Sequence, residues 1–289
     1  MLINFRYNLW QYSYGSSKMK ICSLTVVGTG IKVIAQITLE AKANIEQADK
    51  VLYLVNTPDL KTWIERQNKN SKSLDGLYHK YPLRIDCYQA ITEYVLEETR
   101  KGQNVCMVIY GHPTIFAKSG VDAVIQAEKE GIDARILPGI SAEDCLFADL
   151  RINPGTYGCQ SFEATDFLIH HRQWDVTSEL ILWQVGIIGV LDRPKDDFDN
   201  SRGAKVLQER LLEHYPAEHE IVLYEAAQYP EHNEIVHPKS KPKIAKIALK
   251  NLADAKFSRI STLYIPPARR AKCDSKVLES LGVDINNLK

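Results

Sequence analysis

Two segments of the same character constrain the fold of this chain more than any other feature. In each, a run of apolar and β-branched residues ends in a glycine turn: Val26-Val27-Gly28-Thr29-Gly30, and residues 105–109 followed by Tyr110-Gly111-His112-Pro113. Such runs are typical of buried strands, and glycine tolerates the backbone conformations of a tight turn. We expect both strands in one parallel sheet, with the turns at its carboxyl edge, where open α/β proteins bind small ligands.

Strand and helix patterns alternate through the first half of the chain. Strands are expected at residues 24–27, 51–55, 105–109 and 134–137, and helices at 36–48, 84–101 and 120–130. This alternation predicts a parallel sheet covered by helices. The second half is more mixed, with strands expected at 180–185, 220–224 and 261–265, helices at 204–214 and 276–281, and loops at 192–202 and 232–242.

A Pro-Gly break near the middle separates these two patterns. It reads Pro138-Gly139-Ile140-Ser141, and Ser141 can cap a helix that begins with Ala142-Glu143-Asp144. We therefore predict an N-terminal parallel α/β domain at residues 20–138 and a C-terminal mixed α/β domain at 139–268. Residues 1–19 lack the apolar core of a signal peptide and are predicted to be an extension, and 269–289 a tail.

The composition excludes several functional classes. Lys+Arg and Asp+Glu both number 36, which argues against nucleic-acid binding through bulk charge, and no apolar run approaches the roughly 20 residues of a membrane span. The six cysteines include no Cys-x-x-Cys pair, so a metal site is not expected. Cys106 and Cys145 lie in apolar stretches, as buried free thiols would, and we expect a cytoplasmic protein.

The Gly28-Thr29-Gly30 turn also invites a dinucleotide-binding interpretation. The nicotinamide fingerprint needs a third glycine, where this chain has Val33, and an acidic residue after the second strand, which here ends Val55-Asn56. A lone Gly-x-Gly is weak support for that cofactor. A plain tight turn after a strand explains it better.

The order of three motifs resembles the tetrapyrrole-methylase superfamily of S-adenosylmethionine enzymes. They are Val27-Gly28-Thr29-Gly30, Tyr110-Gly111-His112-Pro113 and the stretch from Leu137 to Glu143. Most of that superfamily has a small residue and Gly-Asp-Pro in the second motif. With Phe162-Glu163-Ala164 and the segment Leu182-Trp183-Gln184-Val185-Gly186, the chain is most similar to borosins, which methylate backbone amides of a ribosomally made precursor.

This resemblance implies the fold and the cofactor. It implies a tetrapyrrole-methylase-like α/β fold of two domains, with S-adenosylmethionine in the cleft between them, and a homodimer. The cofactor contacts carry over to positions in both domains of this chain: Tyr110, His112, Ile115, Ala142, Gln184, Ala226, Ser261 and Thr262.

The resemblance also implies a catalytic set of Tyr81, Arg84 and Tyr88, and we expect Tyr110 to act with them by shaping the methyl-transfer pocket. Arg84 and Tyr88 are four residues apart, so they share one face of the predicted helix. The Tyr81-to-Arg84 spacing is shorter than in the family, which makes Tyr78 a rival for Tyr81. From the residues alone, Tyr88 packing in the core and Arg84 pairing at the surface remains an alternative.

The expected substrate is a separate precursor peptide supplied in trans. Fused borosins carry a helical clasp and the target peptide after the catalytic domain, and residues 268–289 are few and poor in apolar residues. We therefore expect a homodimer that forms a heterotetramer with two precursor chains, without nucleic-acid or membrane partners. Two alternatives stay open: a tetrapyrrole C-methyltransferase, and a non-catalytic subunit that binds peptide or cofactor.

Overall fold

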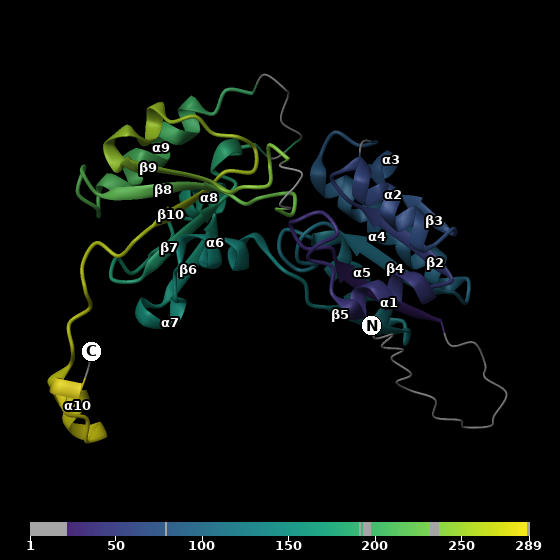
Figure 1. Ribbon diagram of the computed structural model, residues 1–289, viewed down its shortest axis with the longest axis horizontal. Helices are drawn as coiled ribbons and strands as arrows, with labels where there is room; N and C mark the ends of the chain where they lie inside the picture. The colour runs from purple at the N-terminus through teal and green to yellow at the C-terminus, as the bar shows by residue number, and fades with distance from the viewer. Residues whose placement is uncertain (1–21, 79, 191, 193–197, 232–236, 288–289) are drawn as a thin grey trace, which may run out of the picture.

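Two five-stranded sheets, each with its own helices, make up the protein (Figure 1). The computed structural model describes residues 22–78, 80–190, 192, 198–231 and 237–287. The predicted extension at 1–19 lies outside the described residues, as do residues 232–236 of the second predicted loop. The predicted fold class is confirmed, while the domain boundaries stay a prediction.

The first sheet is entirely parallel, as predicted. Its strands follow the order β3-β2-β4-β1-β5. They are β1 (Ser23–Gly28), β2 (Lys50–Leu54), β3 (Ser71–Ser73), β4 (Asn104–Ile109) and β5 (Asp133–Leu137). β1 and β4 are neighbours, with Gly28 in register with Ile109, so the two glycine turns lie at one edge.

Helices cover both faces of this sheet because its side chains alternate between them. Leu52 and Met107 pack on one side with α4 and α5, whereas Val51 and Cys106 pack on the other with α1 and α2. This double burial explains the nearly continuous apolar strands. The helices are α1 (Leu39–Gln47), α2 (Pro58–Gln67), α3 (Asp75–Tyr78), α4 (Arg84–Arg100) and α5 (Lys118–Lys129).

The predicted helix at 36–48 begins three residues later, at Leu39. The Thr38 hydroxyl accepts a hydrogen bond from the Ala41 amide at 3.0 Å and thereby caps the helix. The Gln36 side chain instead accepts bonds from the amides of Ile31 and Lys32, at 2.7 and 2.8 Å. Gln36 therefore holds the turn after β1 rather than starting α1.

The second sheet is mixed, with the order β6-β7-β10-β8-β9, and its β6–β7 pair is parallel while the other pairs are antiparallel. The strands are β6 (Cys159–Glu163), β7 (Glu179–Trp183), β8 (Glu220–Glu225), β9 (Lys243–Ala248) and β10 (Thr262–Ile265). The helices are α6 (Ala142–Leu150), α7 (Pro154–Tyr157), α8 (Ala164–Ile169), α9 (Ser201–Leu212) and α10 (Ser275–Leu281). Three short 3₁₀ turns complete the order: η1 (Val185–Ile187), η2 (Leu249–Asp254) and η3 (Ile285–Asn287).

The two faces of the second sheet have different neighbours. One face packs on α8 and α9. The opposite face packs on α6, and there Trp183 and Tyr224 contact Ile31 and Tyr110 from the first half. The chain passes from the first half to the second in the segment between β5 and α6 (Figure 1). Ser141 caps α6 as predicted, accepting from the Asp144 amide at 3.1 Å.

Further observations concern cysteines, membranes and metals. Cys106 and Cys145 are buried and free, as predicted, and burial raises the pKa of Cys106 to about 12.

No helix in the described part of the chain is long and apolar enough to cross a bilayer. Among the described residues, no group of three or more His, Cys, Asp or Glu side chains is arranged to hold a metal ion.

Candidate functional site

The two glycine turns pack directly on one another and build the floor of the site. The Gly30 amide donates to the Gly111 carbonyl at 3.2 Å, and the Gly111 amide donates to the Gly30 carbonyl at 3.1 Å. A Cβ atom on Gly28 would lie 2.2 Å from the Gly111 oxygen, which leaves space only for glycine. This contact places Ile31 and Tyr110 side by side at the sheet edge.

A cavity of about 180 Å³ lies where these turns meet the second sheet, and we call it the interlobe cavity. Five predicted cofactor residues line it: Tyr110 from the first half and Ala142, Gln184, Ala226 and Thr262 from the second. Its remaining walls are mostly apolar or aromatic: Ile31, Phe116, Trp183, Tyr224, Gln228, Arg259 and Ile260.

Gln184 enters this cavity from a strained turn. It follows β7 with a φ of 58°, a left-handed conformation that costs a non-glycine residue roughly 1 kcal/mol. Two residues later, a Cβ atom on Gly186 would lie 1.9 Å from the Ser258 carbonyl oxygen. The close approach at Gly186 brings the turn that carries Gln184 against the loop that carries Arg259 and leads into β10 at Thr262.

Three other predicted cofactor residues are not among the described residues that line the interlobe cavity. Ile115 is 38% exposed, and half-buried His112 accepts a bond at Nδ1 from the Thr114 amide at 3.2 Å. Ser261 is buried, and its hydroxyl donates to Glu225 at 2.9 Å. All three adjoin lining segments, and their assignment to the cofactor stays a prediction.

The chemistry of the interlobe cavity suits an organic cation with an apolar body. The rings of Phe116 and Trp183 meet edge to face at 6.4 Å, and aromatic faces attract cations. Arg259 is the one cationic residue in the described wall, and it is exposed. Gln184 and Thr262 add hydrogen-bonding groups, so the residues present fit a sulfonium such as S-adenosylmethionine.

A second cavity, of about 440 Å³, adjoins the first, and we call it the tyrosine cavity. Tyr78, Tyr88 and Tyr110 line it, and Tyr110 and Phe116 line both cavities. The ring centroids of Tyr78 and Tyr88 are 6.3 Å apart. The tyrosines therefore surround a space continuous with the interlobe cavity.

Two hydroxyls of the tyrosine cavity, those of Tyr78 and Tyr110, have a raised pKa that favours their neutral form. Burial raises the pKa of Tyr78, and Tyr88 raises it further through its charge and a hydrogen bond, while Arg84 acts in the opposite direction. Burial also raises the pKa of Tyr110 to about 12, against a hydrogen bond with Asn56 that lowers it. Buried phenols of this kind donate hydrogen bonds at neutral pH.

Tyr78 and Tyr81 differ in their position relative to the tyrosine cavity: Tyr78 lines it, and Tyr81 does not belong to its described lining. Tyr81 is absent from the described lining of the tyrosine cavity; the Lys80 ammonium lies 5.5 Å from the centre of its ring. Arg84, at the start of α4, donates to the Val190 carbonyl from the other half. Arg84 is close enough to Tyr78 to affect its pKa. The catalytic assignment of Tyr81 and Arg84 stays a prediction.

Asn56 and Phe116 are among the residues of the tyrosine cavity that were not predicted for the site. Asn56 follows β2, and the carboxyl-edge argument applied to the glycine turns also applies there. Phe116 lies just beyond the Tyr110-Gly111-His112-Pro113 turn with a φ of 53° and is 51% exposed. No sequence pattern marks an exposed aromatic residue in that conformation.

Comparison with known proteins agrees with this geometry. A family model described as Tetrapyrrole (Corrin/Porphyrin) Methylases matches residues 23–241. The chain therefore belongs to the tetrapyrrole methylase family, as its motifs predicted. The fold agrees as well: a uroporphyrin-III-C-methyltransferase from Thermus thermophilus superposes with a TM-score of 0.60 at 20% identity, covering 86% of this chain and 94% of that one.

Within this family, several similar proteins have names that join a methyltransferase to a ribosomally synthesized cyclic peptide precursor. A methyltransferase/ribosomally synthesized gymnopeptides precursor of Gymnopus fusipes is 44% identical over 87% of this chain and 59% of its own length. A type I borosin cyclic peptide precursor of Coprinopsis marcescibilis is 38% identical over 91% of this chain and 68% of its own. The chain spans about three fifths of the length of the first curated relatives it matches, at 59% and 63%.

Proposed function

We propose that this protein transfers methyl groups from S-adenosylmethionine to backbone amide nitrogens of a peptide. The observation that carries the proposal is the junction of the two cavities. Tyr110 and Phe116 line both the interlobe cavity, which fits a sulfonium, and the tyrosine cavity, which offers phenolic groups to an acceptor. The names of the relatives, which join a methyltransferase to a cyclic peptide precursor, support a peptide acceptor.

The acceptor chemistry requires hydrogen-bond donors such as Tyr88, which lines the tyrosine cavity, and Arg84, which lies at the start of α4 outside the described lining. An amide nitrogen is a poor nucleophile because its lone pair is delocalised into the carbonyl. Removing the N–H proton leaves an imidate with most of its charge on oxygen. In this proposal, Arg84 and Tyr88 direct donors at that oxygen, and one such donor contributes about 3–4 kcal/mol to the transition state.

We assign the proton transfer to Tyr78 rather than Tyr81. Tyr78 lines the tyrosine cavity and lies against Tyr88, and Arg84 lowers its pKa against the effect of burial. The raised pKa makes its phenolate a strong base when it forms, as a weakly acidic amide requires. Tyr110, between the cavities, shapes the path of the methyl group.

S-adenosylmethionine, when bound, supplies an electrophilic methyl group. The aromatic walls formed by Phe116 and Trp183 would face its positive charge, Gln184 and Thr262 would hold its polar ends, and Ala226 would pack against it. His112, Ile115 and Ser261 would complete the binding site. The protein's contribution is to position donor and acceptor in line, which alone lowers barriers by several kcal/mol (roughly 7–11 at best).

We further propose that the acceptor is a separate precursor chain, and that the enzyme is a cytoplasmic homodimer that binds two such chains. The relatives' names support a precursor partner. The test is incubation of the purified protein with S-adenosylmethionine and a candidate precursor, followed by tandem mass spectrometry. Methyl groups on backbone nitrogens are expected, and their loss in Tyr88→Phe.

The same experiment separates the alternatives. Methylation of a porphyrinogen carbon, with none on any peptide, would identify a tetrapyrrole enzyme. Donor binding by calorimetry without any methylated product would identify a binding subunit. Absence of donor binding would contradict the proposal as a whole.

A further inference from the structure

One buried polar side chain in the wall of the interlobe cavity, that of Gln228, has no partner within the described part of the chain. The residue is 9% exposed, and its hydrogen bonds to other described residues are those of its main chain. Buried polar groups are nearly always paired, because an unpaired one costs free energy. The free amide therefore indicates a ligand group that pairs with it.

The main chain of Gln228 is fixed between the two halves of the protein. Its amide donates to the Lys239 carbonyl at 2.9 Å, and its carbonyl accepts from the Val33 amide of the first half at 2.8 Å. The next residue, Tyr229, donates its hydroxyl to Asp59 of the first half at 3.0 Å. These bonds fix the position from which the side chain reaches the cavity, and such preorganisation lowers the cost of binding a ligand.

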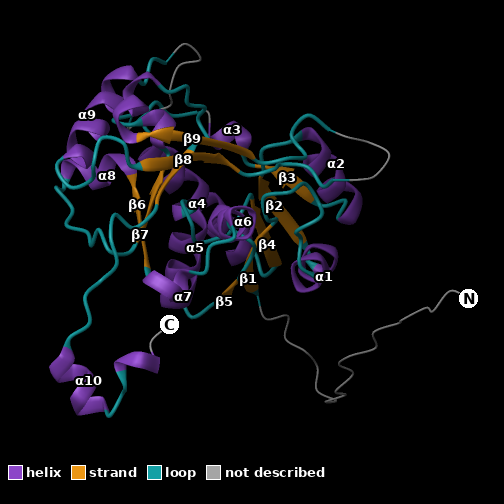
Figure 2. Cartoon of the chain, turned by 60° about the vertical axis from the view of Figure 1, so that its left-hand side comes forward, coloured by secondary structure: helices purple, strands orange, loops and turns teal. Residues whose placement is uncertain are grey.

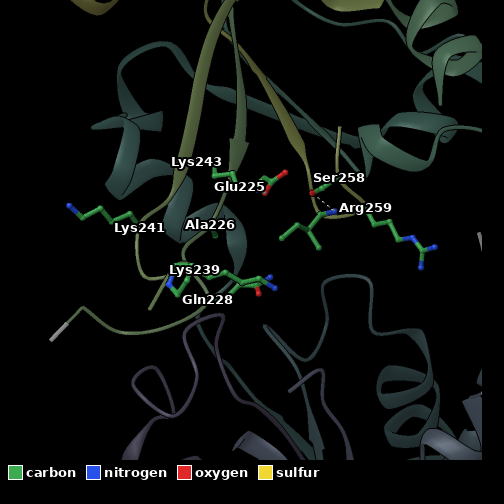
Figure 3. Close-up of a pocket in the computed structure, with 10 residues that line it drawn as sticks. Glu225, Ala226, Gln228, Lys239, Lys241, Lys243, Ser258 and Arg259 are labelled. Carbon is green, nitrogen blue, oxygen red and sulfur yellow. Dashed lines mark hydrogen bonds and ion pairs between the residues drawn. The ribbon is translucent and has the colours of Figure 1, made fainter. Parts of the chain in front are cut away.

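Gln228 lies at the end of the interlobe cavity that is remote from the acceptor. Tyr110 and Phe116 mark the other end because they also line the tyrosine cavity, whose described lining does not include Gln228. Gln228 instead lines a neighbouring cavity of about 360 Å³ (Figure 3), which also shares Ala226 and Ile260 with the interlobe cavity. A donor with its methyl group at the tyrosine end therefore brings a different part of its structure to Gln228.

Adenine is the part of S-adenosylmethionine that best satisfies this amide. A glutamine amide has an N–H donor and a carbonyl acceptor side by side, and the adenine edge has the complement, a 6-amino donor beside a ring nitrogen. A carboxylate only accepts and an ammonium only donates, so either would leave half of the amide unpaired. The neighbouring side chains of Ile31, Ala226 and Ile260 are apolar and suit a planar base.

We propose that the Gln228 side chain pairs with the adenine edge of the donor and makes the site specific for adenine. The amide oxygen accepts from the 6-amino group, and the amide nitrogen donates to the adjacent ring nitrogen. This inference rests on the proposed function and specifies how its donor is recognised. Gln228 is then a specificity-determining residue that takes no part in the transfer itself.

The test is a mutant cycle between the protein and the ligand. The ligands are S-adenosylhomocysteine, which is the donor without its methyl group, and its analogue with hydrogen in place of the 6-amino group of adenine. The proteins are the wild type, Gln228→Met, Gln228→Leu and Gln126→Met. Gln126, on α5, is the matched control because its amide donates to Glu130 at 3.0 Å, outside the described lining of the interlobe cavity.

Calorimetry measures each dissociation constant, and thermal unfolding without ligand checks that each variant is folded. The wild type is expected to bind S-adenosylhomocysteine roughly tenfold more tightly than the analogue, as one lost hydrogen bond predicts. Gln228→Met and Gln228→Leu should bind the two ligands with nearly equal affinity, whereas Gln126→Met should keep the preference of the wild type.

Two results would overturn the inference. Equal binding of the two ligands by the wild type would do so without any variant. A preference that survives in Gln228→Met, with both ligands weakened by the same factor, would assign the side chain to the ribose, to the amino-acid portion of the donor or to the fold instead.

Failure of the proposed function gives a different result. A wild type that binds neither ligand would contradict the donor site and this inference together. A wild type that shows the expected preference for the 6-amino group but methylates no peptide would contradict the methyl transfer alone, because ligand binding is measured without turnover.

Discussion

At the scale of single residues, the two tyrosines before α4 differ in what they touch. Tyr78 lines the tyrosine cavity and lies 6.3 Å from Tyr88, whereas the ring of Tyr81 meets Lys80. We predict that Tyr78→Phe lowers the single-turnover methylation rate by about a hundredfold or more, since general-base catalysis contributes that much. Tyr81→Phe is the control and should stay within a few-fold of the wild type. The reverse pattern would return the assignment to Tyr81.

The raised pKa of Tyr78 leads to a prediction about pH. Burial disfavours the phenolate, so only a small fraction is ionised at neutral pH, and that fraction grows as the pH rises. The single-turnover rate should increase about tenfold per pH unit between about pH 7 and pH 9, without a plateau. Arg84→Gln removes the charge that lowers this pKa, and should slow the reaction at each pH. A plateau below about pH 8 would contradict a base with a raised pKa.

At the scale of secondary-structure elements, the sequence predicts the strands and helices whose apolar residues follow a regular pattern. β1 and β4 were predictable because their apolar runs end in glycine turns, and α4 because one apolar stripe fills it. β3 was not, since it has three polar residues, and neither was β9, where most residues of Lys-Ile-Ala-Lys-Ile-Ala are exposed. Their strand conformation comes from pairing with a neighbour rather than from burial.

The residues of the candidate site also divide into those that a sequence motif predicts and those that it does not. Tyr110, Gln184 and Thr262 belong to recognisable motifs at strand ends, and the structure brings them to one cavity. Arg259 and Ile260 reach that cavity only because Gly186 lets the η1 turn approach Ser258 closely. Such a contact between distant segments leaves no periodic trace in the sequence.

The packing of the two glycine turns predicts a specific instability. In Gly28→Ala the new methyl group would collide with the Gly111 carbonyl, which is backbone and cannot rotate away. We expect a loss of about 2 kcal/mol in the free energy of unfolding. Gly76→Ala is the control, because nothing lies within 4 Å of its added Cβ and it sits in α3. Urea denaturation measures both, and equal midpoints would show that the turns are not packed so tightly.

At the scale of the whole molecule, apolar side chains are exposed on the interlobe cavity, at Phe116 and Ile260, and in the turn after its lining residue Ile31, at Ile34. Ile34, Phe116 and Ile260 are 41%, 51% and 51% exposed. A second copy of the chain would cover such side chains, as the proposed homodimer requires. Light scattering should give twice the 32.8 kDa chain mass, and Ile34→Lys should shift the mass towards the monomer. Ile125→Lys, on α5 and 46% exposed, should not. A monomeric wild type would contradict the proposed assembly.

The proposed function takes its acceptor from a separate precursor chain, and the mass of each chain tests this. α10 lies away from both sheets in the two views, and its exposed Val277 and Leu281 are not among the described residues that line the interlobe or tyrosine cavity (Figures 1 and 2). In this proposal, the peptide in the tyrosine cavity belongs to the precursor. When the protein is incubated with S-adenosylmethionine and a separately expressed precursor, the precursor should gain one methylene mass per transfer and the enzyme none. Tyr88→Phe, which should leave both masses unchanged, controls for spontaneous methylation. Methyl groups on the enzyme's own backbone would show instead that it modifies itself.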